Sequence, residues 1–511
     1  MTAFETISDQ PYLSRTKAQH RGGEKEGSAA FRLQGRAEKA AFLINGNKYF
    51  AEVSRALRQA RRNVWIIGWD FHPNIRLEPE KSDETLADLL HALAAENPEL
   101  EIRILIWALG PIYSDKSIDL LRKKNFPKNA RIDLRFDLQY ALRGCHHQKL
   151  VCIDDAVAFI GGIDMTSRRW DTRRHHAKDK LRRDPDGAPY DPLHDVQAMV
   201  TGEAARLIGD IARRRWENAT GEKHLPLAGS LSFAWPDDLS ISLQDIPVGF
   251  ALTEPETTWR TGIGDGIAST LEIIARARRQ LYIEAQYLAS FRVADAIAAR
   301  LHEEDGPEVV VICTRSSHGL IEKLVMGSNR DRVIRRLKRA DRANRLRVCY
   351  PVVPGPKVPG PETPGQSVQA DSEVEVLIHS KLIIADDELV RIGSSNLNNR
   401  SEGLDSECDL LFEAETGEHR RAIAELYNRL LAEYLGAAPE AFAAAYAQRG
   451  SMIEAIDALN RGARGLREFA VELSGKVSPI TGTAIVDPSR PFLLLHRLGL
   501  GALLRLFART A

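Results

Sequence analysis

The chain has 511 residues, with 70 lysines and arginines against 70 aspartates and glutamates and a hydrophobic content of 43%. This length leaves room for several domains with buried cores, and the composition excludes collagen, coiled coils and wholesale disorder. A net charge of zero argues against a dedicated nucleic-acid-binding protein, which normally carries a basic excess.

The start of the chain, residues 1–36, is polar and shows no sustained apolar period, so it is predicted to be a flexible leader. It lacks the apolar region of a secretory signal peptide. The five cysteines form no CxxC pair, which predicts reduced thiols rather than a disulfide framework. We therefore expect a cytoplasmic protein, with peripheral contact at the inner face of the membrane left open.

The next hundred residues alternate between two patterns. Residues 51–62 predict a helix, 63–71 a strand, 83–96 a helix and 101–109 a strand. This alternation is typical of an α/β fold.

The same order of segments returns in the second half of the chain, which indicates a duplicated unit. The matching pairs are 60–71 with 277–288, 101–109 with 308–316, 131–136 with 345–350, 147–164 with 379–396, and 195–202 with 407–414. We expect a pseudo-twofold α/β structure made of two α/β/α sandwich halves with mixed sheets.

The domain organisation follows from this repeat. The predicted parts are a leader at 1–36, an N-terminal half at 37–220, a connecting segment at 221–258, a C-terminal half at 259–440 and a helical extension at 441–511. Two irregular stretches, 172–192 and the Pro- and Gly-rich 351–373, are expected to be loops beside the functional site.

The strongest match between the halves is a motif with a His, a Lys two residues on, an Asp five residues further, and a small-residue pair. Its two copies consist of His147, Lys149, Asp154, Gly161 and Gly162, and of His379, Lys381, Asp386, Gly393 and Ser394. On a strand, the His and the Lys of one copy point to the same face. They can therefore contact one substrate together.

This set of residues suits a phosphodiester. One neutral imidazole can attack phosphorus and form a phosphohistidine, while the other, protonated, donates to the leaving oxygen. The two lysines supply positive charge beside a transition state that gains negative charge. This reading requires neither a cofactor nor a metal.

Each catalytic His also needs a carboxylate that fixes its tautomer. Asp195 and Glu407 are the candidates, because they open equivalent strands of the repeat. Asp154 and Asp386 belong to the motif and are counted with the catalytic set. Their odd spacing from the His places them on the other face of the strand, where they would anchor the motif by hydrogen bonds.

The candidate substrate-binding residues follow the second motif. Asn396 can donate an amide N–H and Ser394 a hydroxyl to a phosphate oxygen. Gly162, the counterpart of Ser394 in the first copy, completes this set.

In these residues the chain resembles the phospholipase D superfamily, whose members carry two copies of this motif of His, Lys and Asp, called the HKD motif. The resemblance covers about residues 40–440 and includes GGIDMTSRRWD at 161–171, PLHDVQ at 192–197, YIEAQYL at 282–288 and GSSNLNNRS at 393–401. It implies that His147 is the nucleophile and His379 the general acid.

Two positions depart from the family pattern. Asp164 stands where the second copy has Asn396, and an acid there would repel a phosphate if it faced inward. Lipid-acting members of the family carry an acid at this position, so the resemblance implies a structural role. Ala285 replaces the usual Asn of the Y-I-E-N-Q stretch. Four further histidines, His146, His175, His176 and His194, do not predict a metal site, because their spacing matches no common zinc pattern.

Two further features bear on the substrate. Basic runs at 168–183 and 330–347 are equally consistent with a solvated face and with attraction to anionic lipid or nucleic acid. The Leu-rich segment 491–511 has its arginines on one side of a helix, which is typical of a membrane-interfacial helix and also compatible with a packed one.

The expected function is that of a phospholipase D, which hydrolyses the head-group phosphodiester of a phospholipid and can exchange the head group for an alcohol. The expected partners are a phospholipid substrate and a membrane surface, with no nucleic acid. The alternatives are a phosphatidyltransferase resembling cardiolipin or phosphatidylserine synthase, a nuclease of the same motif, and a binding protein with an inactive site. Both motifs retain His and Lys, which disfavours the last alternative.

Overall fold

The computed structural model describes residues 33–110, 131–138, 144–229, 231–256, 261–316, 320–356, 358–359, 369–370 and 372–490. The Leu-rich segment 491–511, most of the expected leader and part of the loop at 351–373 lie outside these residues. In the part of the chain that is described, no helix is both long and apolar enough to cross a lipid bilayer.

Two copies of one α/β unit follow each other along the chain. The first copy comprises β1 (Leu33–Ile44), α1 (Gly46–Leu57), β2 (Asn63–Gly68), α2 (Leu86–Glu96), β3 (Glu101–Trp107), β4 (Ile132–Asp137), β5 (Leu150–Ile153), β6 (Val157–Gly161), β8 (Val196–Thr201) and α4 (Glu203–Thr220). The second comprises β9 (Leu243–Glu254), α5 (Asp265–Arg276), β11 (Gln280–Ala285), α6 (Phe291–His302), β12 (Glu308–Cys313), β13 (Leu346–Pro354), β18 (Lys381–Ala385), β19 (Leu389–Gly393), β20 (Glu407–Glu413) and α9 (Gly417–Leu435). The predicted α/β class and the duplication are confirmed.

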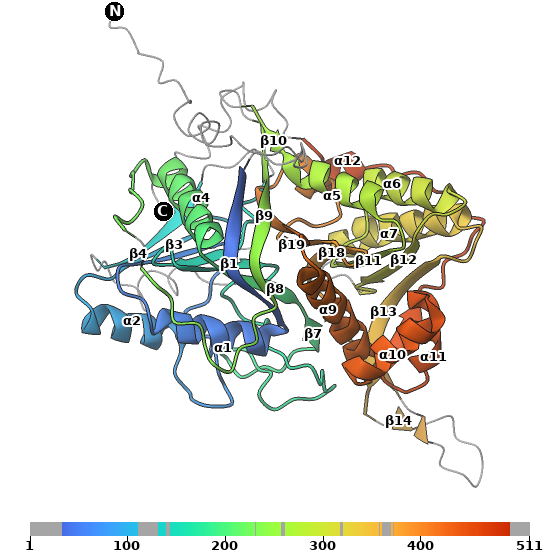
Figure 1. The fold of residues 1–511 in the computed structure, drawn as a ribbon, viewed down its shortest axis with the longest axis horizontal. Coiled ribbons are helices and arrows are strands. Elements are labelled where there is room, and N and C mark those ends of the chain that lie inside the picture. The colour runs from blue at the N-terminus through green and yellow to red at the C-terminus, as the bar shows by residue number, and fades with distance from the viewer. Residues whose placement is uncertain are drawn as a thin grey trace, which may run out of the picture.

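The strands of both copies form one continuous series of hydrogen-bonded neighbours. Its order is β4-β3-β2-β5-β6-β8-β1-β9-β20-β19-β18-β11-β12-β13. The pairs β2–β3, β3–β4, β11–β12 and β12–β13 are parallel and the remaining pairs are antiparallel, so each half contributes a mixed sheet. The two halves join where β1 runs antiparallel to β9 at the centre of the molecule (Figure 1).

Helices cover both sides of each half. Figure 1 shows α1 and α2 on one side of the first half and α4 on the other. In the second half, α5, α6 and α7 (Leu320–Ala340) lie opposite α9, α10 (Pro439–Arg449) and α11 (Met452–Leu459). The central strands β2 and β11 are buried along their whole length, which agrees with their nearly continuous apolar sequences.

A single apolar core lies across the junction of the halves. It includes Trp216 of α4, Phe250 of β9, Phe412 of β20 and Leu430 of α9, each fully buried. Burial of such large side chains stabilises the fold by about 2 kcal/mol each. The junction is therefore a true core, which fixes the relative position of the two halves.

The structure corrects three boundaries of the sequence analysis. Residues 33–36, assigned to the leader, begin β1. The connecting segment at 221–258 contains β9, which is the counterpart of β1 in the second copy. Pro247 concealed this strand, and it is tolerated because β20 pairs only with residues 248–253. The extension after residue 440 is not only helical, because β21 (Gly465–Glu468) pairs with β13.

Candidate active site

Both HKD motifs lie where the two halves meet, because the chain before each motif pairs with the opposite half. The short strands β7 (Leu193–His194) and β17 (Leu377–Ile378) run parallel, and the backbone N–H of His379 donates to the carbonyl of His194 over 2.8 Å. In the same way, the N–H of His147 donates to the carbonyl of Ser406 over 3.0 Å. Each motif is thus held against the loop that carries the other half's carboxylate.

The consequence is a crossed pair of His–carboxylate contacts. Nδ1 of His147 lies 2.9 Å from Oε2 of Glu407, and Nδ1 of His379 lies 2.8 Å from Oδ2 of Asp195. Both carboxylates are fully buried. The two imidazoles are also close enough that a charge on His147 lowers the pKa of His379. Four of the predicted residues therefore converge on one site, with a carboxylate on Nδ1 and the Nε2 atom left for chemistry.

Gly162 lies against both members of the His379–Asp195 pair. A Cβ atom at this position would lie 2.4 Å from Oδ2 of Asp195 and 2.8 Å from the carbonyl oxygen of His379. Any side chain would therefore push the catalytic pair apart. The structure gives Gly162 a steric role in the site, which differs from the substrate contact we expected.

Ser394 occupies the equivalent position of the second copy. Its hydroxyl donates to Oε2 of Glu407 over 2.6 Å, and Ser401 donates to Oε1 of the same carboxylate over 2.7 Å. Ser394 thus supports Glu407 instead of presenting its hydroxyl to a phosphate, which corrects our expectation. The backbone N–H of Asn396 donates to Ser401, and its side-chain oxygen is buried with no hydrogen-bond partner among the described residues.

The two lysines have different partners. Nζ of Lys149 lies 3.1 Å from Oδ2 of Asp164, whereas Nζ of Lys381 donates to the neutral amide oxygen of Gln286 over 3.0 Å. Asp164 also accepts a hydrogen bond from the backbone N–H of Trp69 over 2.8 Å. Its carboxylate is therefore engaged by protein groups, in line with the structural interpretation of this departure.

Burial and the two lysines set the protonation of the site. Burial lowers the pKa of His147 well below its usual range, and the charges of Lys149 and Lys381 lower it further. His379 has its pKa lowered by the same causes, burial first. Burial also raises the pKa of Glu407 to about 8, although the hydroxyls of Ser394 and Ser401 oppose this shift. Lys381 has its pKa lowered to about 7, mainly by burial.

Asp154 and Asp386 lie away from the reacting groups, in equivalent turns. Asp154 has a positive φ of 55° and accepts hydrogen bonds from the backbone N–H groups of Arg61, Arg62 and Asn63 at 2.7, 2.7 and 2.8 Å. Asp386 accepts three from residues 278–280 in the same way. Each carboxylate thus fixes the start of the adjacent strand, β2 or β11.

We expect Asp154→Ala to lower the free energy of unfolding by about 3 kcal/mol, because three backbone N–H groups lose their acceptor and Ala is disfavoured at positive φ. Asp154→Asn should cost less, since Asn keeps one acceptor oxygen and tolerates this φ. Denaturant unfolding of the two variants measures the difference. Equal stabilities of Asp154→Ala and the parent protein would contradict the anchoring role.

The sequence analysis did not single out three residues of the site: Arg169, Gln286 and Ser401. Arg169 adds a third positive charge, which acts on both His379 and Asp195. Arg169 was visible only as part of a basic run and of the GGIDMTSRRWD stretch, and Gln286 only as part of the YIEAQYL stretch. Nothing in the sequence links either of them to a particular motif, because the contacts depend on the packing of the halves.

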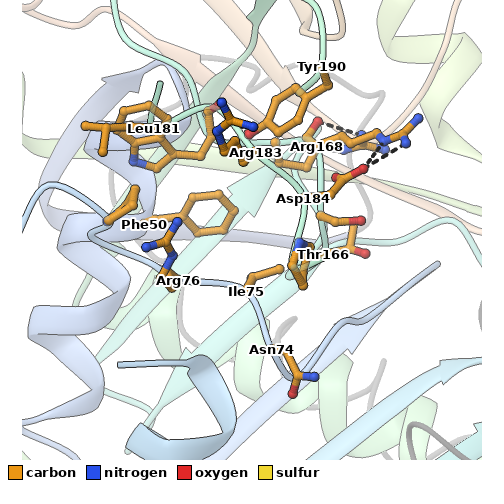
Figure 2. Close-up of a pocket in the computed structure, with 15 residues that line it drawn as sticks. Phe50, Asn74, Ile75, Arg76, Thr166, Arg168, Leu181, Arg183, Asp184 and Tyr190 are labelled. Atoms are coloured by element: carbon orange, nitrogen blue, oxygen red, sulfur yellow. Dashed lines mark hydrogen bonds and ion pairs between the residues drawn. The ribbon is translucent and has the colours of Figure 1, made fainter. Parts of the chain in front are cut away.

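Arg169 also lines a pocket that opens to solvent. Figure 2 shows that Arg76, Arg168 and Arg183 surround it from two loops, together with Tyr190 and a single acid, Asp184, which pairs with Arg168. The guanidinium of Arg183 donates to the backbone carbonyls of Lys180 and Gly187. The lining of the pocket thus carries more positive than negative charge, and one of its residues, Arg169, has a charge that acts on His379.

Comparison with known proteins gives a consistent result. The family model described as phospholipase D matches residues 56–261, and the model described as the PLD-like domain of cardiolipin synthase matches residues 270–432. Each model therefore covers most of one half and includes its HKD motif.

Among curated proteins, phospholipase D C of Dictyostelium discoideum is 30% identical over 34% of this chain and 12% of its own length. Phospholipase D1 of Saccharomyces cerevisiae is 25% identical over 77% of this chain and 28% of its own length. The chain thus spans less than a third of these two relatives.

Among solved structures, the phosphatidylserine synthase of Haemophilus influenzae Rd KW20 shares the fold with a TM-score of 0.51 at 14% identity. The match covers 78% of this chain and 87% of that chain. The duplicated fold, the paired HKD motifs and the two family matches in successive halves agree, and the chain belongs to the phospholipase D superfamily.

Proposed function

We propose that the protein is a phospholipase D that cleaves the head-group phosphodiester of a glycerophospholipid through a phosphohistidine intermediate. The observation that carries this proposal is the crossed pairing of His147 with Glu407 and of His379 with Asp195. It supplies two imidazoles around one phosphorus-sized site, each oriented at Nδ1, with two lysines beside them.

In this mechanism, Nδ1–H of His147 donates to ionised Glu407, which leaves the lone pair of Nε2 free to attack phosphorus. The bond from phosphorus to the head-group oxygen breaks as the new P–N bond forms. His379, whose protonation the negative charge of the bound phosphodiester favours, gives its proton to the leaving oxygen. It then accepts a proton from the water that attacks phosphorus, and the P–N bond to His147 breaks as the new P–O bond forms. Lys149 and Lys381 stabilise the negative charge that develops on the phosphoryl oxygens.

An alcohol can replace water in the second step, because the covalent intermediate outlives the departure of the head group. The same site then performs head-group transfer, as in a phosphatidyltransferase. The match of residues 270–432 to the cardiolipin synthase-like family model supports this second candidate. The two activities differ only in which nucleophile reaches the phosphohistidine.

One residue of the pocket, Arg169, has a charge that acts on His379, the proposed donor to the leaving head group. Four arginines line the pocket, and two of them are paired with acids, Arg76 with Asp83 and Arg168 with Asp184. The remaining positive charge favours an anionic or hydroxyl-rich head group over choline, which carries a positive charge. We therefore propose phosphatidylglycerol as a better substrate than phosphatidylcholine.

The test is to incubate the purified protein, without added metal, with vesicles of phosphatidylglycerol, vesicles of phosphatidylcholine, and single-stranded DNA. Ethanol in a parallel series traps the intermediate as phosphatidylethanol. Release of a lipid head group supports the phospholipase, and dominant phosphatidylethanol supports the transferase. Cleavage of DNA alone, or no reaction at all, would refute the proposed function.

The pH dependence gives a more specific expectation. Ionised Glu407 is the stronger acceptor for Nδ1–H, so kcat/KM should rise with pH as Glu407, whose pKa is about 8, loses its proton. Lys381, whose pKa is about 7, loses its positive charge over the same range, so kcat/KM should pass through a maximum and fall again at higher pH. Ser394→Ala removes a hydrogen bond that favours the ionised carboxylate, and it should move this rise to higher pH. The measurement is kcat/KM against pH for both proteins with a soluble phosphodiester. An unchanged midpoint in Ser394→Ala would contradict the assigned role of Glu407.

A further inference from the structure

A second cluster of buried groups lies behind the catalytic pair and takes no part in the chemistry described above. Nε2 of His175 lies 3.0 Å and Nδ1 of His194 3.2 Å from Oε1 of Glu433, which belongs to α9. The three side chains are buried, and their three ligand atoms lie within 4.8 Å of one another. Two imidazoles and a carboxylate thus converge on one point from opposite halves of the protein.

The other nitrogen of each imidazole is also held by a carboxylate. Nδ1 of His175 lies 2.9 Å from Asp171, and Nε2 of His194 lies 3.1 Å from Glu284. This is the outer-shell arrangement of metal-binding histidines, in which a carboxylate fixes the ring and leaves the second nitrogen for the ion. The inner nitrogens are therefore oriented toward the same point by independent contacts.

The charges around this point do not balance without further positive charge. Asp171, Glu284 and Glu433 are buried carboxylates. The buried guanidinium of Arg182 donates to Asp171 and neutralises the negative charge of that carboxylate. Glu284 also accepts hydrogen bonds from three hydroxyl groups, those of Tyr282, Tyr434 and Ser380. Arg464, which is only partly buried, donates to the backbone carbonyls of residues 173 and 174. Two negative charges remain, to be balanced by two protons on the imidazoles or by one divalent ion.

Asn45 supplies an independent observation. Its side chain is 1% exposed and its Nδ2 lies 2.8 Å from the same Oε1 of Glu433, while its Oδ1 is buried with no hydrogen-bond partner among the described residues. Three nitrogen atoms, from Asn45, His175 and His194, thus lie within hydrogen-bond distance of one oxygen of Glu433, while the amide oxygen of Asn45 has no donor among the described residues. A half-turn of the amide, which exchanges its O and N, would place that oxygen among the ligands.

We propose that His175, His194, Glu433 and Asn45 form a binding site for a divalent transition-metal ion, zinc by its ligand chemistry. Two imidazoles, a carboxylate and an amide oxygen make a four-coordinate set, and separations of 3.0 and 3.2 Å between ligands fit an ion about 2 Å from each. No ligand is left for water, so the site is a structural one.

The ion would join the two halves beside the active site. Asn45, His175 and His194 belong to the first half and Glu433 to the second, while His194 precedes Asp195 in the chain and accepts from the N–H of His379. The sequence could not reveal this site, because Glu433 lies 239 residues from His194. The spacing of the histidines alone matches no zinc pattern.

The test is to measure the metal content of the untagged protein, as purified and after dialysis against Zn²⁺ and then metal-free buffer. We expect about one zinc per chain, and a lower thermal midpoint after prolonged chelation that Zn²⁺ restores and Mg²⁺ does not. Glu433→Gln and His175→Gln should lose the zinc, whereas His176→Gln, at the exposed neighbouring position, should keep it.

Replacement by Co²⁺ in the parent protein should give the visible spectrum of a four-coordinate ion, which keeps the test decisive if the variants do not fold. A protein that holds no zinc, and whose thermal midpoint Zn²⁺ leaves unchanged, would overturn the proposal. In that case the two remaining negative charges would be balanced by two protonated imidazoles, those of His175 and His194. Neither result depends on whether the protein cleaves a phospholipid.

Discussion

His147→Ala is expected to abolish the covalent phosphoenzyme and to lower turnover by on the order of 10⁴-fold or more, because the P–N bond is assigned to His147 and only proton transfer to His379. Rapid quenching of the reaction with a ³²P-labelled phospholipid, followed by alkaline gel electrophoresis, measures the intermediate. The His147 side chain is 15% exposed, so its removal should leave the fold intact, which thermal unfolding can check.

His379→Ala is the matched control for this experiment. It removes the proposed general acid while the nucleophile and its carboxylate remain, so a substrate with a good leaving group, such as a nitrophenyl phosphodiester, should still label His147. Hydrolysis of the labelled enzyme should then be slow, because the same imidazole activates water. Phosphoenzyme that persists in His147→Ala and vanishes in His379→Ala would exchange the two roles.

The repeat made much of the fold predictable. Strands such as Asn63–Gly68 are mostly apolar and recur as Gln280–Ala285 at the same place in the second copy, so their type and order could be inferred. The ends of the copies could not, because β1 begins with polar residues and β9 contains Pro247. Both strands become recognisable only as partners of each other at the centre of the sheet.

The candidate site was predictable to a similar degree. Position in the repeat was enough to nominate Asp195 and Glu407, but not to show that each serves the His of the other half. That exchange follows from the parallel pairing of β7 with β17, two strands of two residues each, which leave no periodic pattern in a sequence. Ser394 contacts Glu407 where β19 and β20 pair, and Glu433 of α9 contacts two histidines of the first half. Neither contact follows from the spacing of these residues in the sequence. The catalytic roles themselves stay predictions.

The two lysines appear equivalent in the sequence, yet their surroundings predict unequal effects. Lys381 faces the neutral amide of Gln286, so Lys381→Met should remove one stabilising charge and lower kcat/KM by about 10²–10³-fold. Lys149 neutralises the buried carboxylate of Asp164. Lys149→Met should therefore cost at least tenfold more, since it also leaves an unpaired negative charge beside a phosphate.

A second substitution separates these two contributions. In the Lys149→Met protein, Asp164→Asn removes the unpaired charge but keeps an oxygen that can accept from the backbone N–H of Trp69, so it should recover about tenfold of the lost kcat/KM. In the Lys381→Met background, the same Asp164→Asn change should give no recovery, because Lys149 still pairs with Asp164 there. Steady-state kinetics on vesicles, with thermal unfolding of every variant, tests both expectations. Equal losses for the two lysine variants, with no recovery in either background, would mean that Asp164 does not act on the phosphate electrostatically and that the asymmetry of the two motifs has no catalytic effect.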